Sequence, residues 1–128
     1  MGIDRNAVAQ YLEEVKDAVR NNRYRISMNA NRGANLALFQ DYVIDEAKAK
    51  QILLDLDVLD FSEIRQNEHA GYEHEQLYIF GKDVKLLERY GNTKKTVSLY
   101  IKFNKLENCF VIVISFHEQR FPLKYYFK

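Results

Sequence analysis

Polar residues in the C-terminal half of the chain are of the types that move protons beside a phosphate. The segment 96–103 alternates with a period of two residues, so Tyr100 and Lys102 share the face of a strand opposite its apolar side chains. His117 directly follows a second apolar segment, and a twisted hairpin of the two segments could bring it to Tyr100. Imidazole titrates near neutral pH, so His117 could donate or accept a proton. Tyr100 could orient or donate, and Lys102 or Lys82 could counter phosphate charge.

These assignments have structural alternatives. His117 could end a core strand and hydrogen-bond a neighbouring carbonyl group. Residues 82–105 include seven basic and two acidic side chains, although the whole chain has a net charge of +1. Such a segment can attract a polyanion, because local potential steers encounter, but lysines on exposed strand faces also keep proteins soluble. Both interpretations stay open from the sequence.

Other clusters of reactive side chains are less specific. The run around Gly71 contains His69, His74 and three glutamates, but it matches no zinc motif such as HExxH, which favours a polar surface loop. Cys109 lies in an apolar run, which favours an inert buried thiol, and the chain has no CxxC pair. No glycine pattern resembles a phosphate-binding loop. We therefore expect neither a metal nor another cofactor.

The composition is typical of a single folded domain. The chain has 128 residues and a mass of 15.2 kDa, and 47% of its residues are hydrophobic, which excludes disorder as the main state. No apolar run approaches the roughly 18 residues that a membrane helix needs. The N-terminus lacks a signal-peptide pattern. We expect a cytoplasmic protein that does not bind membranes.

The first half of the chain predicts helices, because apolar residues recur at helical spacing after acidic N-cap candidates. The expected elements are a helix over 4–20 capped by Asp4, a strand starting within 23–27, a loop over 29–35 with a turn at Gly33, and a helix capped by Asp45.

The second half changes to the period of strands. The expected elements are a polar loop over 63–75, a short strand at 77–80 with a bend at 81–83, a strand at 96–103, a hairpin loop at 104–108, a central strand at 109–116 and an edge strand at 124–127. Two or three helices packed on a small, mostly antiparallel sheet make an α+β fold. We expect one domain over 1–128, with a helical half at about 4–62 and a sheet half at about 76–127.

An ordered set of motifs resembles a known family. The motifs are L-Y-I-F-G-K at 77–82, L-Y-I-K-F at 99–103, V-I-S-F-H-E at 113–118 and P-L-K-Y at 122–125. This set resembles the MqsR-type toxins of bacterial toxin–antitoxin pairs, which belong to the RelE-like group of small RNA-cleaving toxins. The resemblance covers nearly the whole chain.

The resemblance implies a RelE-like fold and a metal-independent, sequence-selective endoribonuclease. Such an enzyme cuts single-stranded messenger RNA and arrests growth. A cognate antitoxin protein would neutralise it, and the toxin would meet DNA only through the complex with that antitoxin.

The family's functional residues carry over in part. Its strand tyrosine falls on Tyr100, and its basic residue after the last core strand falls on His117. Glu63 stands where the family often has a lysine, and Arg65, two residues on, could substitute for it. A glutamine of the best-studied branch aligns near Ile79, which cannot do the same work.

The reaction that the resemblance implies needs a base for the 2′-OH, an acid for the leaving 5′ oxygen and cations for the phosphorane, and it leaves a 2′,3′-cyclic phosphate. The expected roles are acid or base for His117, phosphate positioning for Tyr100, phosphate or RNA binding for Lys102, Lys82, Arg65 and His69, and base stacking for Tyr78. Tyr78 could instead pack between sheet and helix. Two other functions stay open. The protein could be an RNA-binding module without catalysis, or an immunity or antitoxin subunit.

Overall fold

A computed structural model describes residues 2–29 and 31–128 of the chain. The helices are α1 (Arg5–Arg20), α2 (Gly33–Asp41), α3 (Glu46–Leu54) and the short 3-10 helix η1 (Val58–Asp60). The strands are β1 (Tyr24–Ile26), β2 (Phe61–Gln66), β3 (Gln76–Leu87), β4 (Lys94–Lys105) and β5 (Val111–Glu118). The predicted α+β class is confirmed, with α1, α2 and α3 packed on a mostly antiparallel sheet.

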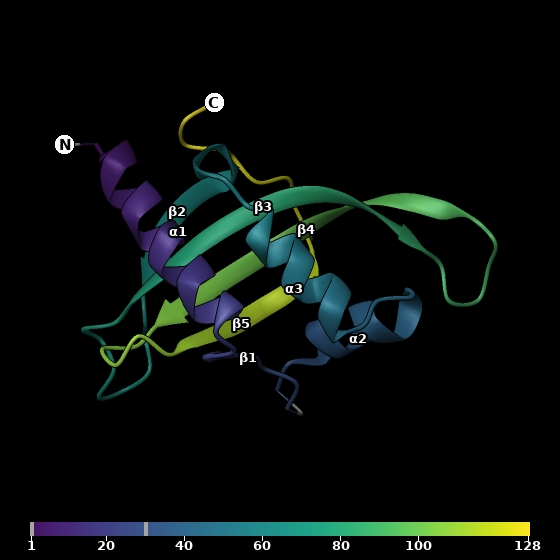
Figure 1. Cartoon of the computed structure of the whole chain (residues 1–128), viewed down its shortest axis with the longest axis horizontal. Coiled ribbons are helices and arrows are strands. Elements are labelled where there is room, and N and C mark those ends of the chain that lie inside the picture. Colours follow the sequence, from purple (N-terminus) through teal and green to yellow (C-terminus); the bar gives the residue numbers. More distant parts are fainter. Residues whose placement is uncertain (1, 30) are drawn as a thin grey trace.

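The sheet has five strands in the order β1-β5-β4-β3-β2 (Figure 1). Neighbours from β2 to β5 pair antiparallel, whereas β1 pairs with β5 in parallel. The first strand of the chain, β1, therefore forms one edge of the sheet. After helices α2, α3 and η1, the chain forms the opposite edge with β2, and β3, β4 and β5 follow in order toward β1. β4 is the central strand. Its alternating apolar and polar residues give it one apolar face and one polar face.

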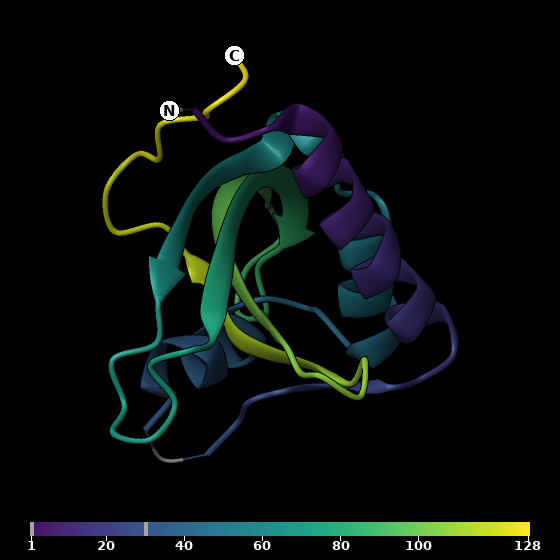
Figure 2. The same cartoon turned by 90° about the vertical axis from the view of Figure 1, so that its left-hand side faces the viewer.

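The apolar core lies between the sheet and helices α1 and α3. The core-facing residues of β4 are the ones that the sequence predicts, and Val97, Leu99, Ile101 and Phe103 are at most 1% exposed. Figure 2 shows α1 and α3 on one side of the sheet and the C-terminal segment on the other. The face turned away from α1 and α3 is called the open face below.

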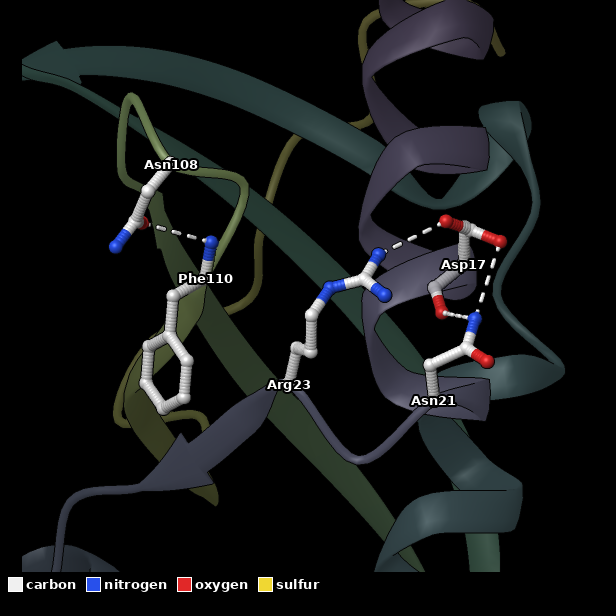
Figure 3. Close-up of polar contacts among 5 residues, drawn as sticks. All are labelled: Asp17, Asn21, Arg23, Asn108 and Phe110. Atoms are coloured by element: carbon white, nitrogen blue, oxygen red, sulfur yellow. Dashed lines mark hydrogen bonds and ion pairs between the residues drawn. The ribbon is translucent and has the colours of Figure 1, made fainter.

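The junction between α1 and β1 is held by local polar contacts (Figure 3). Asn21 caps α1 by donating to the Asp17 carbonyl, and Arg23 forms an ion pair with the Asp17 carboxylate at 3.0 Å. Asn22 has a φ of 59°, in the left-handed region that ends a helix. In the facing β4–β5 turn, Asn108 accepts from the Phe110 amide. β1 itself is held beside β5 by parallel pairing and by the Val111 amide, which donates to the Arg23 carbonyl at 3.0 Å.

A buried asparagine extends the pairing of β5 beyond the end of β1. The Asn35 amide donates to the Ser27 and Ile114 carbonyls at 2.8 and 3.0 Å, and its oxygen accepts from the Phe116 amide at 2.8 Å. Asn35 is 1% exposed and lies on α2, so α2 is fastened to the edge of β5. The side chain completes the strand's hydrogen bonding where no strand continues.

Several predicted boundaries in the first half need correction. The loop expected over 29–35 ends earlier, because α2 begins at Gly33, where the backbone is helical rather than a turn. The polar loop expected over 63–75 starts later, because its first residues form β2, which pairs with β3. Polar residues are compatible with this strand because one of its faces is open. The predicted helices over 4–20 and after Asp45 are confirmed, and both acidic residues accept from their helix's backbone.

The second half also departs from expectation. β3 continues as one strand through Gly81 instead of ending at residue 80, and residues 124–127 form no strand. The hairpin between β4 and β5 is confirmed, but its turn begins after Lys105. Cys109 is exposed in that turn with a φ of 65°, so the expected buried thiol is wrong. Among residues 2–29 and 31–128, no helix is long and apolar enough to cross a membrane.

Candidate functional site

The register of β4 and β5 brings together two of the predicted residues. Tyr100 lies directly opposite His117, and the two rings are nearly parallel, with centroids 5.2 Å apart and an interplanar angle of 10°. Lys102 lies opposite Ser115, one pleat further along the same face. Since paired residues of antiparallel strands point to the same side of the sheet, all of these side chains belong to the open face.

The open face is hollowed by two adjacent clefts of about 440 and 420 Å³ that share Arg65 and Lys102. The first cleft is lined by Glu63, Arg65, Tyr100, Lys102, Ser115, His117, Arg120, Phe121, Pro122 and Leu123. The second is lined by Arg32, Arg65, Gln66, Asn67, Glu68, His69, Leu77, Lys102 and Ile114. We call the two together the open-face groove. Its arginines and lysine outnumber its two glutamates, which suits an anionic polymer.

Strand β2 supplies an ion pair to the groove. A register shift after Phe61 places Glu63 opposite Ile79 and Arg65 opposite Leu77, so both charged side chains point to the open face. The Arg65 Nε donates to the Glu63 carboxylate at 2.7 Å. This hydrogen bond and the charge of Glu63 raise the pKa of Arg65. The paired Glu63 carboxylate thereby belongs to the cleft that Tyr100 also lines.

The C-terminal segment forms one wall of the groove. The Gln119 side chain donates to the Leu99 carbonyl at 2.9 Å and accepts from the Leu123 amide, and the Ser62 hydroxyl donates to the Lys124 carbonyl. Between these anchors the segment presents Arg120 and the 81% exposed ring of Phe121. The wall is therefore polar at its base and aromatic at its rim.

The electrostatic setting distinguishes Lys102 and Tyr100 from ordinary surface residues. Burial lowers the pKa of Lys102, and the charges of Arg32 and Arg65 lower it further. Burial raises the pKa of Tyr100, so its phenol stays protonated at neutral pH and can donate a hydrogen bond. A phosphate placed among these cations would relieve their mutual repulsion.

The imidazole of His117 is oriented by its own strand. Its Nδ1 lies 2.8 Å from the Glu118 carbonyl oxygen, which can only accept, so Nδ1 carries a proton and donates. The other ring nitrogen, Nε2, is then the atom available for proton transfer. His117 can therefore hydrogen-bond a neighbouring carbonyl through Nδ1 and still transfer a proton through Nε2.

The structure separates the predicted RNA-binding residues into two groups. Arg65 and His69 line the groove with the predicted Tyr100, Lys102 and His117. Lys82 and Tyr78 lie on the other face of the sheet. Lys82 pairs in register with the buried Leu99 and forms an ion pair with Asp60 at 3.6 Å, and the Tyr78 ring stacks on Tyr11 of α1 with centroids 3.6 Å apart. This contact supports the packing alternative for Tyr78.

Some groove residues are missed by sequence reasoning. The cations that join Lys102 are Arg32, Arg65 and Arg120, none of which lies in the basic segment 82–105. Two other cations of that segment have structural contacts, since Arg89 donates to the C-terminal carbonyls of α2 and Lys105 forms an ion pair with Glu14. Charge clustered along the sequence therefore did not identify the arginines that line the groove with Lys102.

The two loop histidines do not face one cavity. His69 lines the groove, whereas His74 lines a separate cleft beside Tyr11 and Lys105. Among the residues that the structure describes, no group of three or more histidine, cysteine, aspartate or glutamate side chains is arranged to hold a metal ion.

Comparisons with known proteins add no family assignment. No family model, no curated protein and no solved structure matches the chain. The resemblance to MqsR-type toxins stays a prediction, and the geometry of the groove carries the functional argument.

Proposed function

We propose that this protein is an endoribonuclease that cuts single-stranded RNA by attack of the 2′-OH on the adjacent phosphorus, without a metal. The observation that carries the proposal is the parallel pair of Tyr100 and His117 in a groove that also holds Lys102 and Arg65. An acid–base group, a phenol donor and two cations in one cleft are among the groups that this reaction requires.

RNA supplies its own nucleophile in this reaction, so the protein needs only to move protons and stabilise charge. The phosphate would bind near Lys102 and Arg65, which line both clefts of the groove. The Tyr100 phenol would donate to a phosphate oxygen. His117 Nε2 would transfer a proton, because its other nitrogen is held by the Glu118 carbonyl.

The shape and charge of the groove favour a single strand over a duplex. The clefts are local hollows of about 440 and 420 Å³, and exposed aromatic residues such as Phe121 can stack on splayed bases. The arginines on either side of Lys102 would contact flanking phosphates. Messenger RNA is the substrate that the resemblance to MqsR-type toxins implies.

The biological role that follows from the resemblance is the toxin of a toxin–antitoxin pair. Expression of the chain alone should slow bacterial growth, and co-expression of a neighbouring antitoxin should restore it. An antitoxin or immunity subunit would be harmless in the same experiment.

The test is cleavage of a defined single-stranded RNA by the purified protein in EDTA. We expect products with 2′,3′-cyclic phosphate ends for the unaltered protein and a loss of roughly 100-fold or more in rate for His117→Ala. His74→Ala is the control, because His74 is also a histidine but lies in the loop between β2 and β3 and lines a different cleft. It should cleave at the unaltered rate.

Three other results have distinct meanings. Binding without cleavage by any variant, also with ribosomes added, would support the alternative of a degenerate RNA-binding module. Cleavage only with ribosomes would assign a ribosome-dependent enzyme. If the protein neither cleaves nor binds RNA, the nuclease proposal is refuted and a protein-interaction role is favoured.

A further inference from the structure

Glu63 occupies the position that the family resemblance marks as a departure, and the structure places it inside the proposed site. Its side chain lines the same cleft as Tyr100 and His117. Among the described residues, Arg65 is the one hydrogen-bond partner of the Glu63 carboxylate, and the bond uses only Oε1. Oε2 is therefore left to accept a proton from a ligand in the cleft.

Cleavage by the 2′-OH needs two proton transfers at different places. A base removes the proton from the attacking 2′ oxygen, and an acid delivers a proton to the leaving 5′ oxygen on the far side of the phosphorus. One imidazole cannot hold both positions in the same step. A second titratable group must face the cleft.

The groups that face Glu63 leave it as the base. From β2, Arg65 is cationic, and from β3 the facing residues, Ile79 and Gly81, do not titrate. From β4, Tyr100 is protonated at neutral pH because burial raises its pKa, Lys102 lies among the cations that would bind the phosphate, and the C-terminal wall adds the cation Arg120. Glu68, the other acid of the groove, lines the neighbouring cleft.

We propose that Glu63 is the general base and His117 the general acid of the RNA cleavage. This inference rests on the proposed function. The 2′-O–H proton passes to the Glu63 carboxylate as the O2′–P bond forms. The P–O5′ bond breaks, and the electron pair stays on O5′, which takes the proton of His117 Nε2. The products are a 2′,3′-cyclic phosphate, a 5′-hydroxyl, protonated Glu63 and neutral His117.

Arg65 is a positioning residue in this scheme. Its Nε fixes the carboxylate, and its positive charge also lies near the phosphate that Lys102 would bind. Glu63 is then a proton acceptor at the position where the family often has a lysine, and the cation Arg65 stands two residues later.

The experiment compares Glu63→Gln, Glu63→Lys and the control Glu13→Gln in single-turnover cleavage over a range of pH. The Glu63 side chain is 45% exposed, so its substitution should leave the fold intact, which thermal unfolding would verify. Glu13 lies on α1, with a side chain that is 66% exposed. We expect both Glu63 variants to cleave roughly 100-fold or more slowly, with RNA affinity equal or tighter, and Glu13→Gln to cleave at the unaltered rate.

The pH profile separates a base from a structural residue. The unaltered protein should give a bell-shaped profile, whose rising limb is lost in Glu63→Gln and whose falling limb is lost in His117→Ala. Glu63→Gln cleaving at the unaltered rate, or Glu63→Lys cleaving faster, would overturn the assignment while the nuclease proposal stands. No cleavage by the unaltered protein would overturn both.

Discussion

Gly81 on β3 and Tyr125 in the C-terminal segment approach so closely that a side chain on residue 81 would displace the Tyr125 hydroxyl. A Cβ on Gly81 would lie 2.6 Å from the Tyr125 hydroxyl oxygen and 2.7 Å from Leu123 Cδ1. Gly81 also lies directly opposite Tyr100 in the β3–β4 register. The glycine therefore allows the segment that carries Arg120 and Phe121 to cross the sheet beside the proposed site.

Gly81→Ala should displace the C-terminal wall. Because the alanine methyl overlaps three side chains of that segment, we expect the free energy of unfolding to fall by about 1–3 kcal/mol. RNA affinity should fall with it, since Arg120 and Phe121 move. Urea unfolding and a fluorescence binding assay would measure the two effects.

Gly33→Ala is the matched control for this change. A Cβ on Gly33 meets nothing within 4 Å, and the residue is the first of α2. Its stability should change by no more than about 0.5 kcal/mol. An equal loss of stability in both variants would show that the close approach at Gly81 is unimportant.

The contrast between these two glycines also shows what the sequence could predict. Local signals gave α1 and α3, because their caps are acidic and their apolar residues recur at helical spacing. The alternation of β4 gave the shared face of Tyr100 and Lys102. Gly81 was predicted as a bend, but the crossing segment that requires glycine there belongs to a distant part of the chain.

Which residues meet in the groove depends on strand register and tertiary structure, which no single segment of the sequence determines. The register of β4 and β5 places Tyr100 opposite His117, and a shift of one residue would have moved one of them to the core. The same parity places Lys82 and Tyr78 on the helix side of β3. Arg32 and Arg120 reach the groove only through tertiary structure, from the start of α2 and from the C-terminal segment.

Lys102 should lower the free energy of unfolding, although it contributes to RNA binding. Its folded-state pKa lies below its ordinary value because burial and two arginines disfavour the charged form. The penalty is therefore present at neutral pH and disappears as the pH rises above the ordinary lysine pKa of about 10.4. We expect Lys102→Met to be more stable than the unaltered protein at neutral pH, with the difference shrinking toward that pH.

The same variant should bind RNA more weakly. Loss of one phosphate contact should reduce the slope of log affinity against log salt by about 1. Lys95→Met, whose side chain is 55% exposed and forms a surface ion pair with Glu88, should leave the slope and the stability nearly unchanged. An unchanged slope for Lys102→Met would remove Lys102 from the phosphate site.

Asn35 should be among the most sensitive positions of the fold. Asn35→Ala removes three hydrogen bonds and leaves the backbone groups of Ile114 and Phe116 without that partner at the edge of β5. Each buried unsatisfied group costs about 1–3 kcal/mol, so the free energy of unfolding should drop by several kcal/mol. Asn108→Ala, in the exposed β4–β5 turn, is the control and should cost about 1 kcal/mol or less. Equal costs would mean that α2 is held to β5 by apolar contacts alone.

Phe121 should contribute to RNA affinity through stacking rather than through stability. The ring is 81% exposed at the rim of the cleft that holds His117, so its removal costs the fold little. Base–aromatic stacking contributes about 1–3 kcal/mol per base, so Phe121→Ala should weaken binding of single-stranded RNA by roughly tenfold or more. Tyr90 is a matched aromatic control, because it is 90% exposed at the β3–β4 turn, outside the groove. If Tyr90→Ala weakens binding as much as Phe121→Ala, RNA binds along the hairpin and not in the open-face groove; if only Phe121→Ala does, the C-terminal wall is part of the binding site.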